Sequence, residues 1–223
     1  MDKTQVLERI KSIGIIPVVR ASSGDEALQA VEAIRAGGLP IVEITMTVPG
    51  AVGVIEKLAD HYGDEVLVGA GTVLNAETVR DCLRAGAQFV VSPALDQESI
   101  AYCCQEGVAV FPGALTPTEI VRAWSLGADF VKVFPCGAMG GASYIKSLKA
   151  PLPQIGLIPT GGVSLSNAAT FIQAGAVAIG VGADLVDLGA IRAGHAEKIT
   201  QATRAYLEAV RTARAGMSAA KAT

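Results

Sequence analysis

The sequence predicts an α/β fold of the (β/α)8 barrel class, also called a TIM barrel, and two observations lead to this prediction. The first is a repeated joint, in which a glycine ends an amphipathic stretch and a short apolar run follows it. This joint occurs at Gly37, Gly86, Gly107, Gly127 and Gly175. A glycine at a helix C-terminus before a buried strand is typical of repeating β-α units. The second is a length of 223 residues, which suits one such barrel and is short for two domains.

Eight strands can be placed along the chain, each bounded by glycine, proline or polar residues. We expect them at residues 15–19, 41–45, 66–69, 89–91, 108–110, 128–135, 156–159 and 177–179. Helix start signals support this spacing, since Asn75 can cap one helix and Thr116 forms a capping box with Glu119. An open doubly wound sheet is the alternative, but no GxGxxG motif opens a helix after the first strand.

The two ends of the chain predict where the domain begins and stops. Residues 1–10 have the pattern of a short amphipathic helix, and a helical stretch from His195 to about Arg214 closes the domain. We therefore expect a single domain over residues 1–214. Residues 215–223 are small and polar, so we expect a flexible tail there.

Composition and charge argue against several classes of partner. Hydrophobic residues make up 51% of the chain and charged residues 17%, which is ample material for a core. The formal net charge is −3 and no Lys/Arg cluster occurs, so nucleic acid is not an expected partner. The longest apolar run, residues 174–183, is too short to cross a bilayer, and we expect no membrane partner.

The cysteines and histidines indicate which cellular compartment and which cofactors to expect. The four cysteines form no CxxC pair, which indicates free thiols and a reducing cytoplasm. His61 and His195 are far apart and lack ligand spacing, so we expect neither a metal site nor another cofactor. We interpret Cys136 as a wall residue without a chemical role and Trp124 as a packing residue.

Lys132 is the most informative residue of the chain. It stands in the middle of the apolar run Phe130-Val131-Lys132-Val133-Phe134, where an ammonium is costly unless it is paired. Burial disfavours the charged form of an amine, and the neutral amine is the nucleophile of Schiff-base chemistry. A lysine that reaches solvent or makes a structural ion pair is the alternative interpretation.

Glu43 repeats this anomaly with the opposite sign, as the one charge in the run Pro40-Ile41-Val42-Glu43-Ile44. Two buried strand charges can converge on the axis of a barrel. A purely structural ion pair there gains little, because desolvating both ions offsets their attraction. The functional interpretation is a lysine nucleophile with a carboxyl group that relays protons.

Further candidates lie at the C-terminal ends of the predicted strands, where barrels place their functional residues. Glycines end the last two strands, and backbone N–H groups there can hold a phosphate. Arg20 ends the first strand and can bind a carboxylate or phosphate. The candidates for substrate binding are Arg20, Thr47, Thr72, Pro93, Phe134, Gly161, Gly162, Gly182 and Ala183.

Six short motifs occur in order between residues 42 and 163. They are Val42-Glu43-Ile44-Thr45, Gly69-Ala70-Gly71-Thr72-Val73, Ser92-Pro93, Phe111-Pro112-Gly113, Phe130-Val131-Lys132-Val133-Phe134-Pro135 and Thr160-Gly161-Gly162-Val163. Together they resemble the KDPG/KHG aldolase family, the bacterial class I aldolases of 2-keto-3-deoxy-6-phosphogluconate and 4-hydroxy-2-oxoglutarate. The similarity extends over nearly the whole chain, from about Val6 to about Arg211.

The resemblance implies a trimeric (β/α)8 enzyme that splits a 2-keto-4-hydroxy acid into pyruvate and an aldehyde without a metal. It implies that Lys132 forms the Schiff base and that Glu43 is the acid and base. Thr72 would then lie by the pyruvate carboxylate, and Pro93 and Phe134 would line the pocket. Gly161 and Gly162 would hold a distal phosphate.

The sequence departs from the phosphogluconate-type pattern at two positions. Thr47 stands where those enzymes commonly have arginine, and Ala183 stands where they have serine. The galactonate-type branch (KDPGal aldolase) has an arginine at the end of strand 1, which Arg20 matches, so we carry the carboxylate-binding role to Arg20.

Two other functions stay open on the sequence alone. A phosphosugar isomerase or epimerase could use Glu43 as a base on the same barrel, without an imine. A trimeric assembly scaffold would show no turnover.

Overall fold

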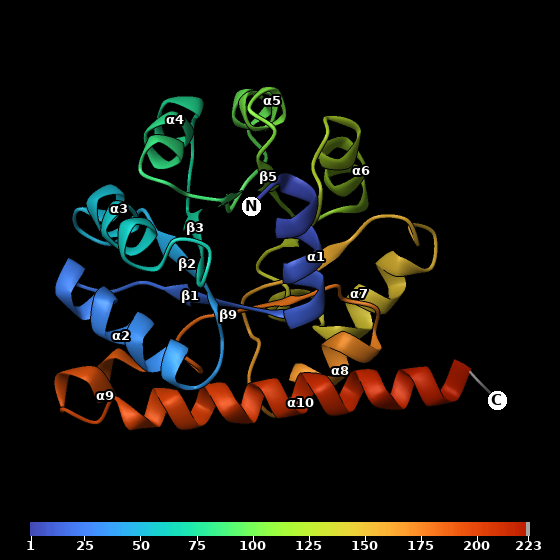
Figure 1. Cartoon of the computed structure of the whole chain (residues 1–223). Helices are drawn as coiled ribbons and strands as arrows, with labels where there is room; N and C mark the ends of the chain where they lie inside the picture. Colours follow the sequence, from blue (N-terminus) through green and yellow to red (C-terminus); the bar gives the residue numbers. More distant parts are fainter. Residues whose placement is uncertain (222–223) are drawn as a thin grey trace.

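The computed structural model describes residues 1–221 and shows an α/β fold in which helices surround a central set of parallel strands (Figure 1). The strands are β1 (Ile15–Val19), β2 (Ile41–Thr45), β3 (Leu67–Gly71), β4 (Phe89–Val91), β5 (Ala109–Phe111), β6 (Gly113–Ala114), β7 (Val131–Val133), β8 (Leu157–Pro159) and β9 (Ile179–Val181). The helices are α1 (Lys3–Ile13), α2 (Gly24–Ala36), α3 (Ala51–Tyr62), α4 (Ala76–Arg84), α5 (Gln97–Gln105), α6 (Pro117–Ser125), η1 (Gly137–Met139), α7 (Ala142–Lys149), α8 (Ala168–Gln173), α9 (Leu188–Arg192) and α10 (Glu197–Lys221).

The strands form two parallel sheets. The larger has the order β5-β4-β3-β2-β1-β9, and the smaller has the order β6-β7-β8. Each strand is buried along its whole length, as its apolar sequence predicts. A single bridge between Thr160 and Gly180 links β8 to β9.

The two sheets also share one stretch of chain, residues 109–114. Its first half is β5, which pairs with β4, and its second half is β6, which pairs with β7. Pro112 lies between the halves, and its carbonyl accepts a hydrogen bond from Lys132 N at 3.0 Å. We expected this strand to end before Pro112, and β5 does end at Phe111. The sequence did not indicate β6, a separate two-residue strand that begins directly after the proline and pairs with β7. A proline lacks only the N–H group and can stand where the chain changes pairing partners.

The strands expected at 15–19, 41–45 and 89–91 have the predicted bounds, and most of the others differ by one or two residues. The strand expected at 128–135 is shorter, since β7 is Val131–Val133, and the last strand is displaced. We expected residues 177–179, whereas β9 is Ile179–Val181. The reason is that Gly180 has the sequence character of a turn but pairs with Ile16 of β1. A Cβ at Gly180 would lie 2.2 Å from Thr160 Oγ1, so the glycine allows close packing inside the sheet.

Helix α1 covers the N-terminal ends of the strands, on the side away from the candidate site. Asp2 caps it in a capping box with Gln5, and Gly14 ends it in the left-handed conformation. Arg9 donates hydrogen bonds to carbonyls that precede β2 and β3, and Lys3 pairs with Asp129 at 2.9 Å.

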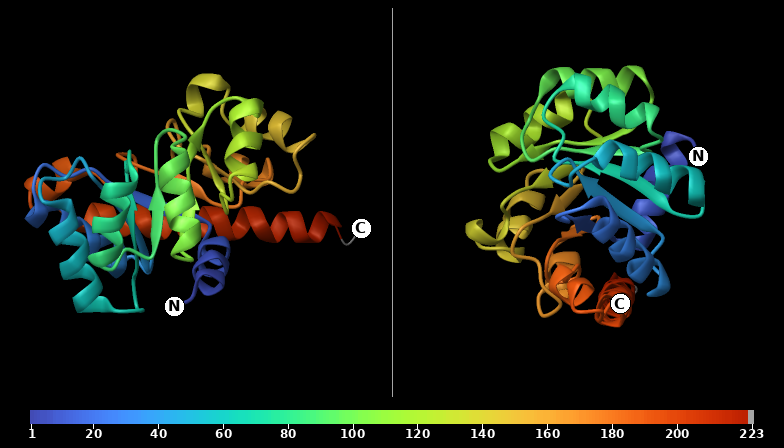
Figure 2. Two further views of the ribbon diagram at one scale, coloured as in Figure 1. Left: turned by 90° about the horizontal axis from the view of Figure 1, so that it is seen from above. Right: turned by 90° about the vertical axis from the view of Figure 1, so that its left-hand side faces the viewer.

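Helix α10 runs along one side of the molecule and contacts α2 and α8 (Figures 1 and 2). We expected a flexible tail from residue 215, but the helix continues to Lys221, and residues 222 and 223 lie outside the described part. The stretch is rich in alanine, which has the highest helix propensity, so small residues there favour the helix. Within residues 1–221, no helix has the length and apolar character that crossing a membrane requires.

Candidate active site

Lys132 and Glu43 meet in the interior of the protein. Lys132 lies at the centre of β7, and Glu43 lies at the centre of β2. Lys132 Nζ is 3.7 Å from Glu43 Oε1, and the two side chains are 2% and 3% exposed. The predicted meeting of these two charges is confirmed, even though their strands belong to different sheets.

This ion pair has few hydrogen bonds to support it. A separation of 3.7 Å permits ionic attraction but is too long for a hydrogen bond. Glu43 Oε1 is buried and accepts no hydrogen bond from any residue that the structure describes. A buried pair needs excellent geometry and further hydrogen bonds before its attraction exceeds the cost of desolvation. The pair is therefore a poor stabilising element and a suitable reactive one.

A glycine of β3 makes room for the Glu43 carboxylate. In the parallel register Glu43 is opposite Gly69, and Gly71 follows two residues later on the same face. A Cβ at Gly71 would lie 2.0 Å from Glu43 Oε1. Glu43 can keep its conformation only because position 71 has no side chain.

Phe134 connects the ion pair to a cavity. Lys132 Nζ lies 5.5 Å from the centre of the Phe134 ring, a distance at which the ring face attracts an ammonium. The cavity has a volume of about 260 Å³. It is lined by Val18, Arg20, Phe134, Thr160, Gly161, Gly162, Val163, Gly180, Gly182, Ala183 and Asp184. These residues belong to β1 and β9 or follow β1, β7, β8 and β9, so the cavity lies at the C-terminal ends of the strands.

The positions of the cavity that hold glycine do so for different structural reasons. Gly161 and Gly162 both have positive φ values, 81° and 78°, which L side chains rarely adopt. Gly182 has neither a positive φ nor any atom within 4 Å of an added Cβ. The backbone therefore requires glycine at 161 and 162, whereas glycine at 182 leaves open space in the cavity.

Arg20 and Thr72 come together at the rim of this site. Arg20 Nη1 donates to Thr72 Oγ1 at 3.4 Å. Thr72 has a φ of 58° and is the one non-glycine with positive φ among residues 1–221. Such a conformation is costly for a β-branched residue and is found most often at functional sites. Arg20 thus lies between Thr72 and the glycines of the cavity.

Comparison with known proteins gives this arrangement a family. The sequence profile described as "KDPG and KHG aldolase" matches residues 6–202. The chain belongs to this aldolase family. The chain is 39% identical over 197 residues to the 2-dehydro-3-deoxy-6-phosphogalactonate aldolase of Escherichia coli K12. The alignment covers 88% of this chain and 96% of that relative.

Solved structures of the family have the same fold. A KDPG aldolase from Legionella pneumophila, with pyruvate captured as a covalent carbinolamine, superposes with a TM-score of 0.84 at 28% identity. That match covers 91% of this chain and 98% of the other. A chain of a protein cage designed by fusing symmetric oligomeric domains has a TM-score of 0.86 at 36% identity, and the match covers 94% of this chain and 76% of the other.

Three predicted substrate-binding residues of this aldolase-family chain lie outside the cavity lining: Thr72, which contacts Arg20 at the rim, Thr47 and Pro93. Thr47 is exposed, and its Oγ1 lies 2.6 Å from Thr45 Oγ1. Thr45 Oγ1 in turn contacts the Val19 carbonyl at 2.9 Å, so this hydroxyl pair links β2 to β1. Pro93 packs its backbone against β6, since a Cβ at Gly113 would lie 2.2 Å from the Pro93 carbonyl carbon.

Five residues of the cavity in this aldolase-family chain were not among the candidates predicted from the sequence: Val18, Thr160, Val163, Gly180 and Asp184. A signal existed for two of them. Thr160 directly precedes the Gly161-Gly162 pair, and Asp184 directly follows Ala183. Both are polar residues next to a glycine loop that was already a candidate for phosphate binding. The other three are apolar or glycine and carry no separate signal.

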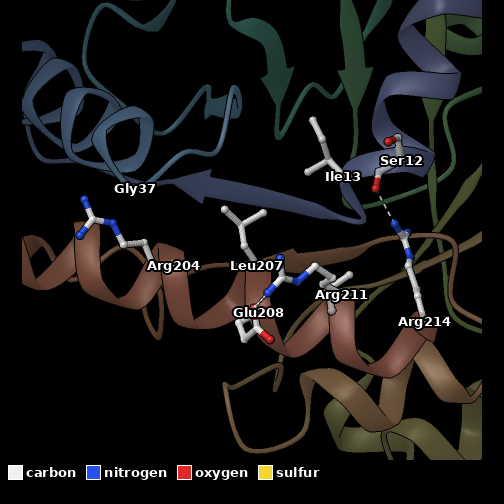
Figure 3. Close-up of a pocket in the computed structure, with 9 residues that line it drawn as sticks. Ser12, Ile13, Gly37, Arg204, Leu207, Glu208, Arg211 and Arg214 are labelled. Carbon is white, nitrogen blue, oxygen red and sulfur yellow. Dashed lines mark hydrogen bonds and ion pairs between the residues drawn. The ribbon is translucent and has the colours of Figure 1, made fainter. Parts of the chain in front are cut away.

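A larger cavity, of about 460 Å³, lies along α10 (Figure 3), and none of the predicted site residues lines it. Its arginines have structural partners. Arg214 donates hydrogen bonds to the Ser12 and Lys11 carbonyls at the end of α1, at 2.5 and 2.6 Å. Arg211 pairs with Glu208 on its own helix. Cations near helix C-termini are stabilising, so we assign these arginines to the packing of α10 in this aldolase-family chain.

The cysteine and tryptophan singled out in the sequence have different surroundings. Cys136 is fully buried, and burial raises the pKa of its thiol to about 11, so the thiol stays protonated at neutral pH. Trp124 is 45% exposed on α6, near Val121 at 40%. The packing role expected for Trp124 within the chain is therefore not what the structure shows.

Proposed function

We propose that this chain catalyses the retro-aldol cleavage of a 2-keto-4-hydroxy acid to pyruvate and an aldehyde through a Schiff base. The observation that carries the proposal is the contact between Lys132 Nζ and Glu43 Oε1, 3.7 Å apart in the interior of the protein. An amine nucleophile and a carboxyl group side by side are the two groups that this chemistry needs.

In the first half of the reaction, the neutral amine of Lys132 adds to the C2 carbonyl and gives a carbinolamine. The Glu43 carboxyl group donates a proton to the departing hydroxyl, water leaves, and a protonated imine remains. Family membership supports this route, because the Legionella pneumophila enzyme is described with pyruvate captured as a carbinolamine.

In the second half, the Glu43 carboxylate takes the proton of the C4 hydroxyl, directly or through a water molecule. The C3–C4 bond breaks, its electron pair moves toward the imine nitrogen, and the aldehyde leaves. The resulting enamine accepts a proton at C3, and water releases pyruvate and the free Lys132 amine. In this proposal, one carboxyl group serves each proton transfer because the buried site excludes other bases.

The cavity supports a substrate with a distal phosphate. Gly161-Gly162 and Gly182-Ala183 face one space at the ends of β8 and β9, where backbone N–H groups can bind an anion. Ala183 has no hydroxyl to add, so backbone groups would carry this binding. We propose 2-dehydro-3-deoxy-6-phosphogalactonate as a substrate, since the E. coli relative acts on it by name and Arg20 lines the cavity.

Pro93 would bound the other side of the substrate in this proposal, and Thr72 would contact the pyruvate carboxylate. Thr47 would act indirectly, through its contact with Thr45. The positive φ of Thr72 and its hydrogen bond from Arg20 support the placement of Thr72.

We further propose that the strands close into a complete (β/α)8 barrel and that the chain forms a homotrimer. The shared stretch 109–114 and the bridge between Thr160 and Gly180 support closure. The oligomeric cage chain and the exposed apolar pair of Val121 and Trp124 support an assembly. Sedimentation equilibrium of the purified protein tests the trimer. The cytoplasmic location stays a prediction.

Reductive trapping tests the proposed function. Incubation with pyruvate and sodium borohydride should attach a stable adduct to Lys132, mapped by peptide mass spectrometry. Lys146, a surface residue of α7, supplies the matched control, and Lys146→Ala should take up the label like the unmodified protein. A Lys132→Ala protein that is labelled at the unmodified rate contradicts the assignment. An isomerase or epimerase would need no imine and would show no adduct.

A further inference from the structure

One carboxylate oxygen joins three separate segments beside the cavity. Asp184 Oδ2 accepts a hydrogen bond from Leu165 N at 3.0 Å and one from the Tyr206 hydroxyl at 2.5 Å. Leu165 follows β8, Asp184 follows β9, and Tyr206 lies on α10. The loops that end the two strands are thus fastened to each other and to the long helix.

The donor from α10 is held firmly. Tyr206 is 0% exposed and is among the largest fully buried side chains of the described residues. Burial and the hydrogen bond to Asp184 raise the pKa of Tyr206, so its hydroxyl stays a donor over the physiological range. A hydrogen bond to a charged acceptor is stronger than one between neutral groups. Tyr206 therefore gives Asp184 a fixed point of attachment.

The segments on both sides of this oxygen are locally ordered by their own hydrogen bonds. Asn167 Nδ2 donates to the Gly162 carbonyl at 2.9 Å, and Asn167 Oδ1 accepts from Ser164 N at 2.8 Å. After β9, the Gly182 carbonyl accepts from Val186 N at 2.9 Å. Each loop thus has internal hydrogen bonds, and the bond from Leu165 N to Asp184 Oδ2 links one loop to the other.

This spacing has consequences for binding, because Ala183 offers no side-chain donor. An anion in the cavity would depend on backbone N–H groups from both loops, and their separation must then match the anion. Asp184 also carries a negative charge at the cavity wall. Two donors on Oδ2 disperse that charge and hold it in one orientation, which reduces its repulsion of a bound anion.

We infer that Tyr206 is a positioning residue for the distal phosphate of the substrate, acting through Asp184 on the loops after β8 and β9. The inference rests on the proposed aldolase function and deepens it. It assigns phosphate recognition to a residue of the outer helix that touches neither the phosphate nor the reacting carbon atoms.

The test compares two substrates that differ only in the phosphate, 2-dehydro-3-deoxy-6-phosphogalactonate and 2-dehydro-3-deoxygalactonate. Tyr206→Phe keeps the ring and removes the hydroxyl. Tyr62→Phe is the matched control, since Tyr62 is also buried and its hydroxyl donates to Glu32 of α2, and neither residue lines the cavity. Both proteins are assayed for kcat and KM with both substrates, and thermal melting checks that each is folded.

For Tyr206→Phe, kcat/KM of the phosphorylated substrate should fall about tenfold, the loss expected for a hydrogen bond to a charged group. The loss should reside in KM, with kcat retained. The plain substrate and the control protein should show no such change. A merely structural role for Tyr206 would lower both substrates alike, and equal losses or no loss would overturn the inference.

A double-mutant cycle gives a second, independent outcome. If Tyr206 acts through Asp184, Asp184→Ala and the double variant should have the same selectivity for phosphate, and additive effects would contradict that route. Pyruvate trapping at Lys132 separates this inference from the proposed function. Normal trapping without a phosphate-selective loss removes only the role of Tyr206, whereas failed trapping removes the proposed function.

Discussion

Gly71 leaves the space that the Glu43 carboxylate occupies, since a Cβ there would lie 2.0 Å from Glu43 Oε1. The strands β2 and β3 hold the two residues in place, so neither can move aside without disturbing the sheet. The geometry of the Glu43 carboxylate is therefore set by a residue with no side chain of its own.

Gly71→Ala should displace the Glu43 carboxyl group and lower kcat by about 10²-fold or more, the range for loss of a general acid–base group. The circular dichroism spectrum should stay that of the folded protein. Gly53, in α3, is a matched control because an added Cβ there would meet nothing within 4 Å. Activity of Gly71→Ala within threefold of the unmodified protein would show that Glu43 has freedom that the structure does not indicate.

Glu43→Gln keeps the shape of the side chain and removes its titrating proton. We expect turnover to fall by about 10²–10⁴-fold, while binding of substrate changes much less. Single-turnover kinetics with pyruvate trapping should locate the loss in proton transfer. Retention of turnover within threefold would assign the proton relay to water or to another group.

Arg20 could bind either the carboxylate or the distal phosphate of the substrate, because it contacts Thr72 and also lines the cavity. If it binds the carboxylate common to all 2-keto acids, Arg20→Ala should weaken every substrate by about 1.5–3 kcal/mol. We expect this outcome, since backbone N–H groups can hold the phosphate. The measurement is kcat/KM for one phosphorylated and one plain substrate, and a loss confined to the phosphorylated one would reverse the assignment.

Glu26 should make stability depend on pH at the acidic end. The hydroxyl and the N–H group of Ser22 donate to Glu26 Oε2 at 2.7 and 2.6 Å and lower its pKa below the ordinary 4.5. A lowered carboxyl pKa gives stability that is present above the unfolded-state value and is lost as pH falls through the folded-state value. The melting temperature of the unmodified protein should therefore drop more steeply below pH 4.5 than that of Glu26→Gln. Parallel curves for the two proteins would contradict this.

The sequence was sufficient to predict that Lys132 and Glu43 come together, for a physical reason. Lys132 and Glu43 each interrupt an apolar strand, and a buried charge without an obvious partner is rare enough to indicate function. The helix and strand order could be predicted as well, since glycine joints and capping residues are local signals. The catalytic roles of Lys132 and Glu43 stay predictions until the variants are measured.

Other features depend on distant contacts and could not be predicted. The short strand β6 after Pro112 forms because its residues pair with β7, whereas β5 before the proline pairs with β4. The hydrogen bond between Tyr206 and Asp184 joins residues that are 22 positions apart. One lies on a helix and the other follows a strand, and the two meet only in the folded chain. We expected a flexible end after residue 214 because the residues there are small and polar, whereas their alanines favour a helix and the structure extends α10 to Lys221.

The stretch 109–114 has a consequence for how the protein opens. Because its first half, β5, is paired with β4 and its second half, β6, is paired with β7, a displacement of this stretch breaks hydrogen bonds in both sheets. Amide protons of β4 and of β7 should therefore exchange with deuterium at similar, slow rates, through one shared opening event. The two sheets would then unfold as a single cooperative unit, and the residues around Pro112 would be among the last to lose their hydrogen bonds.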